Sequence, residues 1–326
     1  PMIVNSDERQ WTWMDEGLNT FMQFLSEQEW ERDYPSYRGE ARNIADYMKS
    51  EDQVPIMTNS DSVLQFGSNG YSKPATALNV LRETIMGREL FDFAFQQYAQ
   101  RWQFKRPEPA DLFRTLEDAS AVDLDWFWNA WFFTTDHVDL ALEPVQHFRI
   151  DTRDPDVEKS RQRFEKESEA PSLTDRRNDE MERRIDRFPE LADFYNEYDA
   201  LDLTQKDVDD YAKLLEGLSD EDEALLKSKL NFYVVTVRDT GGIPMPVVLE
   251  LDYSDDSSEE LRIPVEVWRK NPETVTKLVI SEKELVRVTL DPYLEIADAE
   301  LTNNVWPPEM EPKTFQLQES GGSGRE

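Results

Sequence analysis

The two histidines are the first residues to test for chemistry. His137 and His147 are the only histidines among 326 residues, and neither has a His at i+4, so the zinc motif His-Glu-x-x-His is absent. Zinc prefers imidazole and thiolate ligands, and the chain has no Cys. It also lacks a Gly-x-Ser-x-Gly elbow and a Walker-type phosphate loop. The residues taken alone therefore specify no complete active site, and both histidines are expected to be structural or surface residues.

A carboxylate in an aromatic context stands near the start of the chain. Residues 13–21 read WMDEGLNTF, which resembles the helix that carries the third zinc ligand in the M1 (gluzincin) family of zinc aminopeptidases. That family has His-Glu-x-x-His, then eighteen residues, then Glu within Trp-x-(Asn/Asp)-Glu-Gly. Fifteen residues precede Glu16. The resemblance thus implies that Glu16 is a metal ligand and that the chain is the C-terminal portion of such an enzyme, beginning just after the His-Glu-x-x-His helix.

Tyr71 offers a second group that could act on a substrate. Tyr71, Lys73 and Pro74 stand in the run GYSKPA, which is similar to the Tyr-x-Lys-Gly motif of the same family. There the Tyr hydroxyl donates to the oxyanion of the tetrahedral intermediate, as a preorganised donor aimed at developing charge. The resemblance implies that Tyr71 is catalytic. Pro74 departs from the family's usual Gly, while Tyr71 and Lys73 keep their spacing.

Two further matches extend the resemblance along the chain. Residues 125–132 (DWFWNAWF) resemble the helical segment that closes the family's catalytic domain, and residues 298–307 (DAELTNNVWP) resemble the end of the β-sandwich in a bacterial branch. The resemblance covers about 1–150 and 231–307 and leaves 151–230 unaccounted for. The aromatic residues of the first match are expected to be core rather than substrate contacts: Trp126, Phe127, Trp128, Trp131 and Phe132.

The resemblance implies a defined chemistry in a parent enzyme and a gap in this chain. Two upstream His and Glu16 would hold Zn²⁺, the upstream Glu would act as general base, and Tyr71 would stabilise the oxyanion. The family's free-amine recognition motif, Gly-x-Met-Glu-Asn, also lies upstream. One carboxylate cannot hold catalytic zinc at useful affinity. This chain alone is therefore expected to bind no tight zinc and to be inactive.

The same interpretation names partners. The parent's substrate would be a peptide cleaved at its N-terminal bond, and the missing N-terminal half of the enzyme would cover an apolar face of the helical region. Left exposed, that face would favour self-association. The alternative is a non-catalytic binding or interaction module on an M1-like scaffold, which would have no need for Glu16 and Tyr71 together. The compartment stays open, with a periplasmic or exported protein favoured.

The first region, residues 1–150, must position Glu16 and Tyr71. Apolar residues at i, i+3, i+4 and i+7 predict one helix face: Leu18, Phe21, Met22 and Leu25. Pro is tolerated in a first helical turn, so Pro74 predicts a helix that begins close to Tyr71. Further helices are predicted within 39–49, 90–98, 111–118 and 125–133. Together these elements predict the helical, incomplete part of a thermolysin-like catalytic domain.

The second region, residues 151–230, is highly charged. Asp, Glu, Lys and Arg dominate 153–169, and Pro171 with Ser172 interrupts that pattern. Residues 179–187 and 208–218 are predicted to be exposed helices. We interpret this region as an acidic helical linker or insertion.

The third region, residues 231–307, changes to period two, which marks half-buried strands. The alternation runs through 233–237, 249–253, 261–267 and 286–290. Turn residues separate these runs, as at Gly241-Gly242 and Asn271-Pro272. The pattern predicts a small antiparallel β-sandwich, so the fold class is α+β and multidomain. Residues 308–326 are predicted to be a flexible tail.

Composition limits the classes of partner. The net charge is −33 with a pI near 4.4, a balance that repels nucleic-acid phosphates and anionic lipid heads. Hydrophobic residues make up 38% and aromatic residues 11% of the chain, enough for a sizeable core. No run of eighteen apolar residues occurs, so no membrane span is predicted. Without Cys, no disulfide framework can form.

Overall fold

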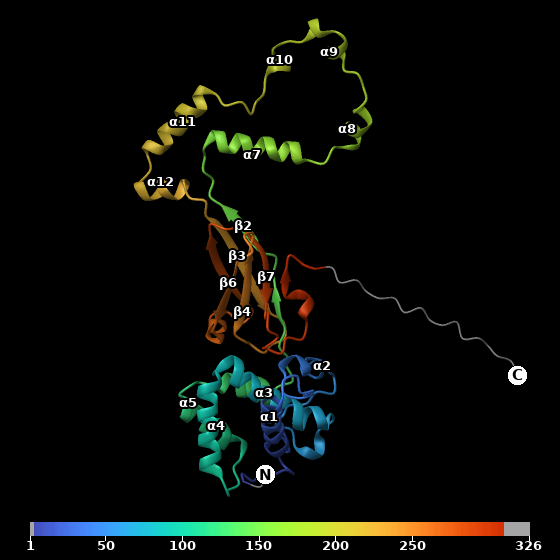
Figure 1. Ribbon diagram of the computed structural model, residues 1–326, viewed down its shortest axis with the longest axis vertical. Coiled ribbons are helices and arrows are strands. Elements are labelled where there is room, and N and C mark those ends of the chain that lie inside the picture. The colour runs from blue at the N-terminus through green and yellow to red at the C-terminus, as the bar shows by residue number, and fades with distance from the viewer. Residues whose placement is uncertain (1–2, 310–326) are drawn as a thin grey trace, which may run out of the picture. The chain divides into compact units, whose positions relative to one another are not determined.

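The computed structural model describes residues 3–309 as two compact units (Figure 1). The described residues of Pro1–His147 and Phe232–Glu326 form the first unit, and Phe148–Asn231 form the second. Nearly all of the tail predicted for 308–326 lies outside the described residues. None of the helices in the described range is long and apolar enough to cross a membrane.

The first unit begins with a helical region. Its α-helices are α1 (Trp13–Trp30), α2 (Ala45–Met48), α3 (Lys73–Val80), α4 (Arg88–Trp102), α5 (Pro109–Ser120) and α6 (Asp125–Trp128). Three π-helical turns adjoin them: η3 (Ser68–Ser72), η4 (Leu81–Ile85) and η5 (Asn129–Phe133). Short 3₁₀ turns are η1 (Ala41–Asn43) and η2 (Ser60–Ser62). The helices predicted at 18–25, 90–98, 111–118 and 125–133 are therefore present, whereas 39–49 forms two short pieces.

The apolar face predicted for the first helix is only partly covered. Phe21 is fully buried, and Leu18 and Leu25 are half-buried. Met22 is 46% exposed. One side of α1 thus packs into the core, while Met22 lines an open groove between α1 and α4.

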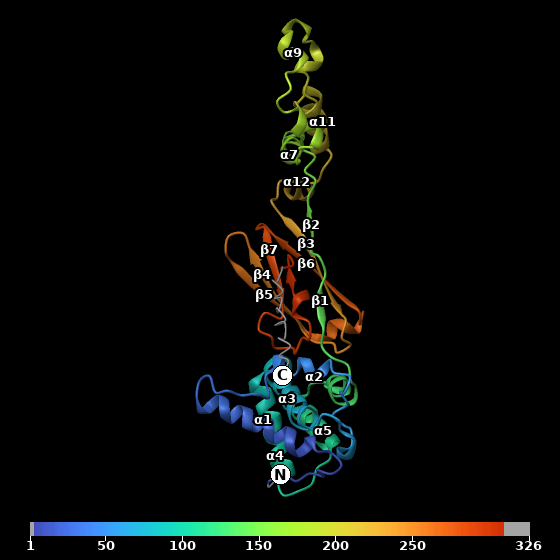
Figure 2. The ribbon, with the colours of Figure 1, turned by 90° about the vertical axis from the view of Figure 1, so that its right-hand side faces the viewer.

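The strands of the first unit form two four-stranded sheets, which Figure 2 shows as two layers. The first contains β1 (Leu140–Leu142), β2 (Gln146–Arg149), β3 (Asn231–Asp239) and β6 (Thr274–Ser281), with β3 paired to the other three. The second has the order β5 (Ser258–Ile263), β4 (Val247–Tyr253), β7 (Leu285–Leu290) and β8 (Val305–Trp306), all antiparallel. The 3₁₀ turns η7 (Val265–Arg269) and η8 (Leu301–Asn303) complete this region.

The alternation of apolar and polar residues predicts most of these strands, but it wrongly extends one of them. Tyr233, Val235 and Val237 of β3 are buried, as period two requires. The strand predicted for 261–267 is wrong beyond Ile263: Pro264 cannot donate to a strand ladder, and Val265–Arg269 forms η7 instead.

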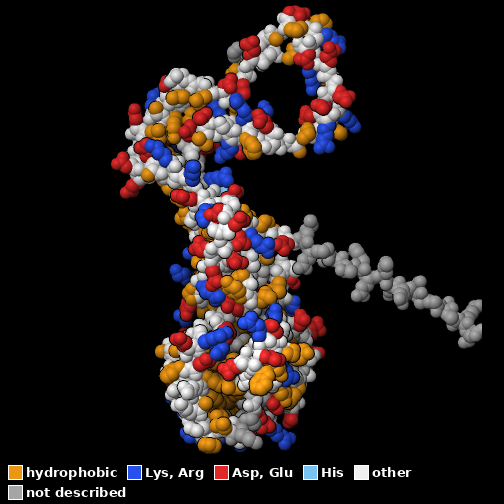
Figure 3. Space-filling model, viewed as in Figure 1, with side chains coloured by type: hydrophobic (Ala, Val, Ile, Leu, Met, Phe, Trp, Pro, Cys, Tyr) orange, Lys and Arg blue, Asp and Glu red, His pale blue; other side chains and the backbone are white. Residues whose placement is uncertain are grey.

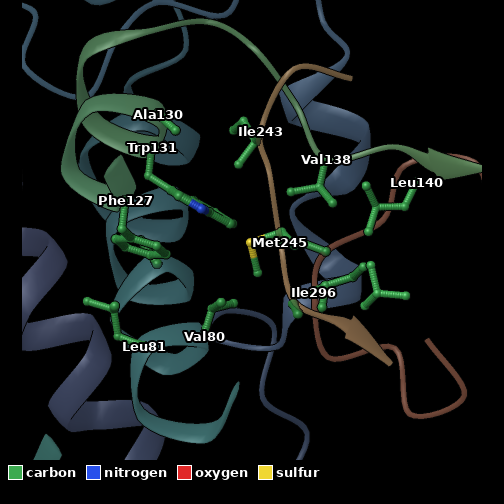
Figure 4. Packing of buried hydrophobic residues seen from close by; sticks show 14 of the residues in the cluster. Val80, Leu81, Phe127, Ala130, Trp131, Val138, Leu140, Ile243, Met245 and Ile296 are labelled. Atoms are coloured by element: carbon green, nitrogen blue, oxygen red, sulfur yellow. The ribbon is translucent and has the colours of Figure 1, made fainter. Parts of the chain in front are cut away.

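One core joins the helical region to the sheets. Its buried residues run without a break from Phe127 and Trp131 of the helices to Met245 and Ile296 of the sheet region. Figure 4 shows Met245 between Trp131 and Val138, at the point where the two regions meet. The aromatic run predicted to be core is core for Phe127, Trp128, Trp131 and Phe132, all at most 3% exposed, while Trp126 is half-buried.

The second unit is helical. Its elements are α7 (Pro155–Ser168), α8 (Leu173–Asn178), α9 (Arg184–Arg187), η6 (Pro189–Leu191), α10 (Phe194–Glu197), α11 (Gln205–Glu216) and α12 (Asp220–Leu226). No described side chain between residues 148 and 230 is buried. Charged contacts join its elements: Lys159 of α7 lies 2.6 Å from Asp207 of α11, and Arg163 contacts Asp199 at 2.8 Å. The segment therefore contains exposed helices, with no hydrophobic core among these residues.

Candidate functional site

Glu16 lies in the first turn of α1, next to Asp15. A helix N-terminus carries partial positive charge and favours carboxylates there. Asp15 is buried and accepts a hydrogen bond from Asn19 Nδ2 at 2.7 Å, whereas Glu16 is half-buried. Burial raises the pKa of Asp15, and a hydrogen bond with Glu8 raises it further. Of the two neighbours, Asp15 is held inside the fold and Glu16 is accessible to a ligand.

Tyr71 lies in the π-helical turn η3, immediately before α3. Such turns are rare and occur often at functional sites. The neighbouring Glu16 carboxylate is the main reason that the pKa of Tyr71 is raised, through hydrogen bonding and its negative charge. The two residues singled out from separate motifs therefore meet in space, and the hydroxyl keeps its proton.

Gly17 has no side chain, and this allows the segment of Glu16 to pack closely against the segment of Tyr71. A Cβ atom on Gly17 of α1 would stand 2.6 Å from Cγ of Pro74, closer than real Cβ contacts. Gly70 approaches Thr12 in the same way, with 3.1 Å from its would-be Cβ to Thr12 Cγ2. Pro74, the departure from the family motif, thus packs directly on the glycine that follows Glu16.

Replacing Gly17 with Ala is expected to destabilise the chain by a net 1–2 kcal/mol or so. Overpacking a core costs about 1–3 kcal/mol, and the rigid Pro74 ring cannot turn away. The better helix propensity of Ala returns up to about 1 kcal/mol. Urea unfolding measures the change. The matched control is Gly67→Ala, where the nearest atom to the new Cβ lies 4.0 Å away and φ is −62°. Equal stability of the two variants would contradict this packing argument.

Two residues that the sequence did not single out contact the Tyr71 ring. The Arg38 guanidinium carbon lies 4.6 Å from the ring centroid, and the Phe66 ring meets it edge-on at 6.1 Å. The positive charge of Arg38 lowers the pKa of Tyr71, opposing the effect of Glu16. Arg38 also lines a pocket of about 370 Å³ with residues of α1 and the following loop. No motif marks Arg38, because its role depends on a contact between distant segments.

A buried polar network fixes the start of α3. Lys73 is fully buried, and its Nζ donates to Gln53 Oε1 at 2.7 Å. Gln53 Nε2 in turn donates to the carbonyls of Met48 at 2.6 Å and Thr135 at 2.7 Å. Burial lowers the pKa of Lys73 to about 8, although the charge of Asp136 acts in the opposite direction. The Lys of the motif is therefore a structural tie between three segments rather than a group facing a substrate.

The donor set does not fit a metal site built from this chain alone. Catalytic zinc takes three protein ligands. Among residues 3–309 no three His, Asp or Glu side chains come together as a group that could hold a metal ion. His137 forms a β-bridge with Gly242, and the His147 ring stacks on Tyr233 at 4.4 Å. Both histidines thus have structural positions, and Glu16 is a single candidate ligand.

Comparisons with known proteins agree with the motifs. Residues 3–131 match the model described as the Peptidase family M1 domain. Human glutamyl aminopeptidase is 26% identical over 145 residues, which are 40% of this chain and 14% of that protein. The alanine/arginine aminopeptidase of Saccharomyces cerevisiae is 26% identical over 138 residues, 40% of this chain and 16% of that protein. The chain thus spans less than a fifth of the length of these relatives.

A solved structure is also similar. It is Legionella pneumophila aminopeptidase A in complex with aspartic acid, matched at 12% identity and a TM-score of 0.38 over 83% of this chain and 20% of that one. The residues that match the family model, 3–131, include both Glu16 and Tyr71. These sequence matches relate the helical region of this chain to the M1 peptidase family and to aminopeptidases.

Proposed function

We propose that this chain is part of a zinc-dependent M1 aminopeptidase, in which Glu16 is one metal ligand and Tyr71 is the oxyanion donor. The observation that carries the proposal is the position of the Tyr71 hydroxyl beside the Glu16 carboxylate, which raises the pKa of Tyr71. A ligand and an oxyanion donor must both lie within reach of one carbonyl oxygen, so their contact is what such a site requires. The two upstream His and the general base would come from the rest of the enzyme.

Each residue of this chain then has a defined task. Zinc would supply the Lewis acid and the activated water of a metallopeptidase. Tyr71 is protonated at neutral pH, and Glu16 raises its pKa further, so its hydroxyl can donate to an oxyanion. The Arg38 guanidinium packs on the ring and limits its movement. The Lys73–Gln53 bond holds the turn that carries Tyr71 against neighbouring loops. The parent would cleave N-terminal residues from peptides.

The groove between α1 and α4 supports a partner for the helical region. It has a volume of about 1040 Å³, and Figure 3 shows hydrophobic side chains gathered around this hollow. Met22 is 46% and Phe93 50% exposed in it. Charged residues such as Glu29, Arg82 and Asp92 line the groove beside these apolar side chains, and exposed apolar side chains with a polar rim are typical of an interaction site. In the proposed enzyme the occupant is the upstream half, and without it the occupant is a second copy of this chain.

The chain by itself is expected to be folded, to hold no stoichiometric zinc and to hydrolyse no aminoacyl reporter. Leucine p-nitroanilide serves as the reporter, metal analysis follows gel filtration, and a thermal melt checks folding. Sedimentation in the same buffer measures self-association through the groove. The complete enzyme, with its upstream half, is expected to hold about one zinc per chain and to cleave the reporter.

Two results would contradict the proposal. Stoichiometric zinc together with hydrolysis by the chain alone would mean that its own residues make the site. A folded complete protein without peptidase activity would favour the alternative, a non-catalytic interaction module on the same scaffold. In that case Glu16→Gln would leave zinc content unchanged, whereas the proposed enzyme should lose affinity for zinc on that substitution.

A further inference from the structure

Another cavity lies away from Glu16 and Tyr71, where the helical region meets the sheets. Its volume is about 440 Å³, within the range of small-ligand pockets. Trp126 of α6, Val265 and Trp268 of η7, and Pro244 after the β3–β4 turn line it. All of these residues belong to the same compact unit, so the cavity has walls that are fixed relative to one another.

Aromatic and proline side chains give the cavity rigid apolar walls. Trp268 is 4% exposed, and its Nε1 donates to the Met245 carbonyl at 2.7 Å, which fixes the indole. Trp126 is half-buried and packs edge-on against Phe127. Indoles on a cavity wall can bind apolar groups, and their faces also attract cations.

One end of the cavity carries negative charge. Asp239 accepts hydrogen bonds from Gly241 N at 3.1 Å and Gly242 N at 2.8 Å, and both use its Oδ1. Within residues 3–309 no hydrogen-bond donor reaches its Oδ2. Burial raises the pKa of Asp239, and the charges of Asp139 and Asp136 raise it further. A positive group at this end would relieve that repulsion.

The other charged residues of the cavity lining leave it negatively charged. Glu266 also lines the cavity, is exposed, and has no ion pair within the described part of the chain. Arg269 is the one cationic residue of the lining, and its Nη2 is 3.1 Å from Asp123 Oδ2, so its charge is already paired. The carboxylates of Asp239 and Glu266 therefore line the same cavity as two indole rings. Among the described residues, the lining contains no unpaired cation that would neutralise their negative charge.

We propose that this cavity binds a peptide through a cationic nitrogen, an alkylammonium or guanidinium group, seated between the indoles and the carboxylates of Asp239 and Glu266. Lysine and arginine side chains carry that group, and so does a free peptide N-terminus. An anionic ligand would meet like charge and is disfavoured. The site does not depend on the proposed peptidase function, because none of its residues touches Glu16 or Tyr71.

The test uses the full chain with indole ¹⁵N labels and four small probes. These are N-acetyl-arginine amide, N-acetyl-lysine amide, leucine amide with its free α-amine, and uncharged N-acetyl-norleucine amide. The cationic probes are expected to shift the indole signals of Trp126 and Trp268 saturably, and to bind at least about tenfold more tightly than the norleucine probe. The arginine and lysine probes report side-chain recognition, and leucine amide reports recognition of an N-terminus.

Charge-changing variants separate this proposal from simple apolar binding. Asp239→Asn keeps Oδ1 as the acceptor for both glycine N–H groups. This variant and Glu266→Gln are each expected to weaken the binding of the cationic probes by about fivefold or more. Arg269→Gln should tighten them. The control is Glu282→Gln, an exposed carboxylate outside the cavity, which should change nothing. The proposal would be overturned if the norleucine probe bound as tightly as the cationic probes. It would also be overturned if the indole signals showed no saturable shift up to about 10 mM probe, or if folded Asp239→Asn bound the cationic probes with unchanged affinity.

Discussion

In the complete enzyme, Tyr71→Phe is expected to lower kcat by about 10²–10³-fold while KM stays within a few-fold of its original value. The substitution removes only the hydroxyl, which lies beside the Glu16 carboxylate in this structure. The ring keeps its contacts with Arg38 and Phe66, so its position should not change. A donor that acts on the oxyanion contributes to the transition state rather than to substrate binding, and its loss therefore falls on kcat.

Zinc content and a control variant distinguish this result from a damaged site. Tyr71→Phe should retain the metal, because the substituted group is not a proposed ligand. Tyr37→Phe is the control: this residue is 86% exposed and lies close in sequence to Arg38. Its kcat is expected to stay unchanged. A Tyr71→Phe enzyme that keeps its full kcat with normal zinc would show that another donor faces the oxyanion.

Local motifs singled out Glu16 and Tyr71 as candidate site residues, and only tertiary contacts show which residues surround them. Glu16 and Tyr71 stand in short runs whose aromatic and glycine neighbours are recognisable in sequence. Their proximity is not predictable from sequence, because it arises where α1 packs on the segment of Tyr71, with Gly17 against Pro74. Arg38 and Gln53 carry no motif at all. Each acts on a residue in a distant segment, Arg38 on Tyr71 and Gln53 on Lys73.

Periodicity predicted elements where one face is buried and missed those where it is not. β3 alternates clearly because one of its faces packs in the core. β7 alternates only at Val288 and Leu290; at its start Leu285 is buried and Val286 is exposed, where its pairing with β4 shifts register. β6 was missed: Val275 and Val279 are buried, but Leu278 and Ile280 are each about half exposed, so apolar residues occur on both faces. The π-helical turn that holds Tyr71 was also missed, since its hydrogen bonds leave no mark on a period of 3.6 residues.

Charge runs concealed a well-formed helix in the second unit. The charge pattern of 153–169 predicts no specific helix within the acidic linker or insertion, yet 155–168 form α7. The signals were local: Asp154 caps the helix by accepting from Asp156 N, and Pro155 occupies its first turn. Arg161 then pairs with Glu158 and Glu165 along one face. The capping residue and the proline predict this helix, whereas hydrophobic periodicity does not, because the helix buries no apolar face.

The stability of the chain is expected to rise by about 3 kcal/mol between pH 8 and pH 10.5 relative to a Lys73→Met variant. Lys73 is fully buried, and within the described residues its ammonium has one hydrogen-bond acceptor, Gln53 Oε1. Three N–H donors with one acceptor leave a buried cation poorly solvated. For this reason burial lowers the pKa of Lys73 to about 8, from an ordinary value of 10.5.

The sign follows from proton counting. Between these two pKa values the unfolded chain holds a proton on Lys73 and the folded chain does not, so raising the pH favours the folded state. Below about pH 8 both states are protonated and the difference between wild type and variant is constant. Urea unfolding at pH 7.5, 9 and 10.5 measures this difference, and other titrating groups cancel because both proteins contain them.

A surface lysine provides the matched control. Lys270 is exposed, and Lys270→Met should change the free energy of unfolding by the same amount at every pH. Parallel curves for wild type and Lys73→Met would mean that the Lys73 ammonium is solvated in the folded state. The buried tie between α3, Gln53 and the carbonyls of Met48 and Thr135 would then be open to water, and the turn that carries Tyr71 would lose the rigidity that a preorganised donor needs.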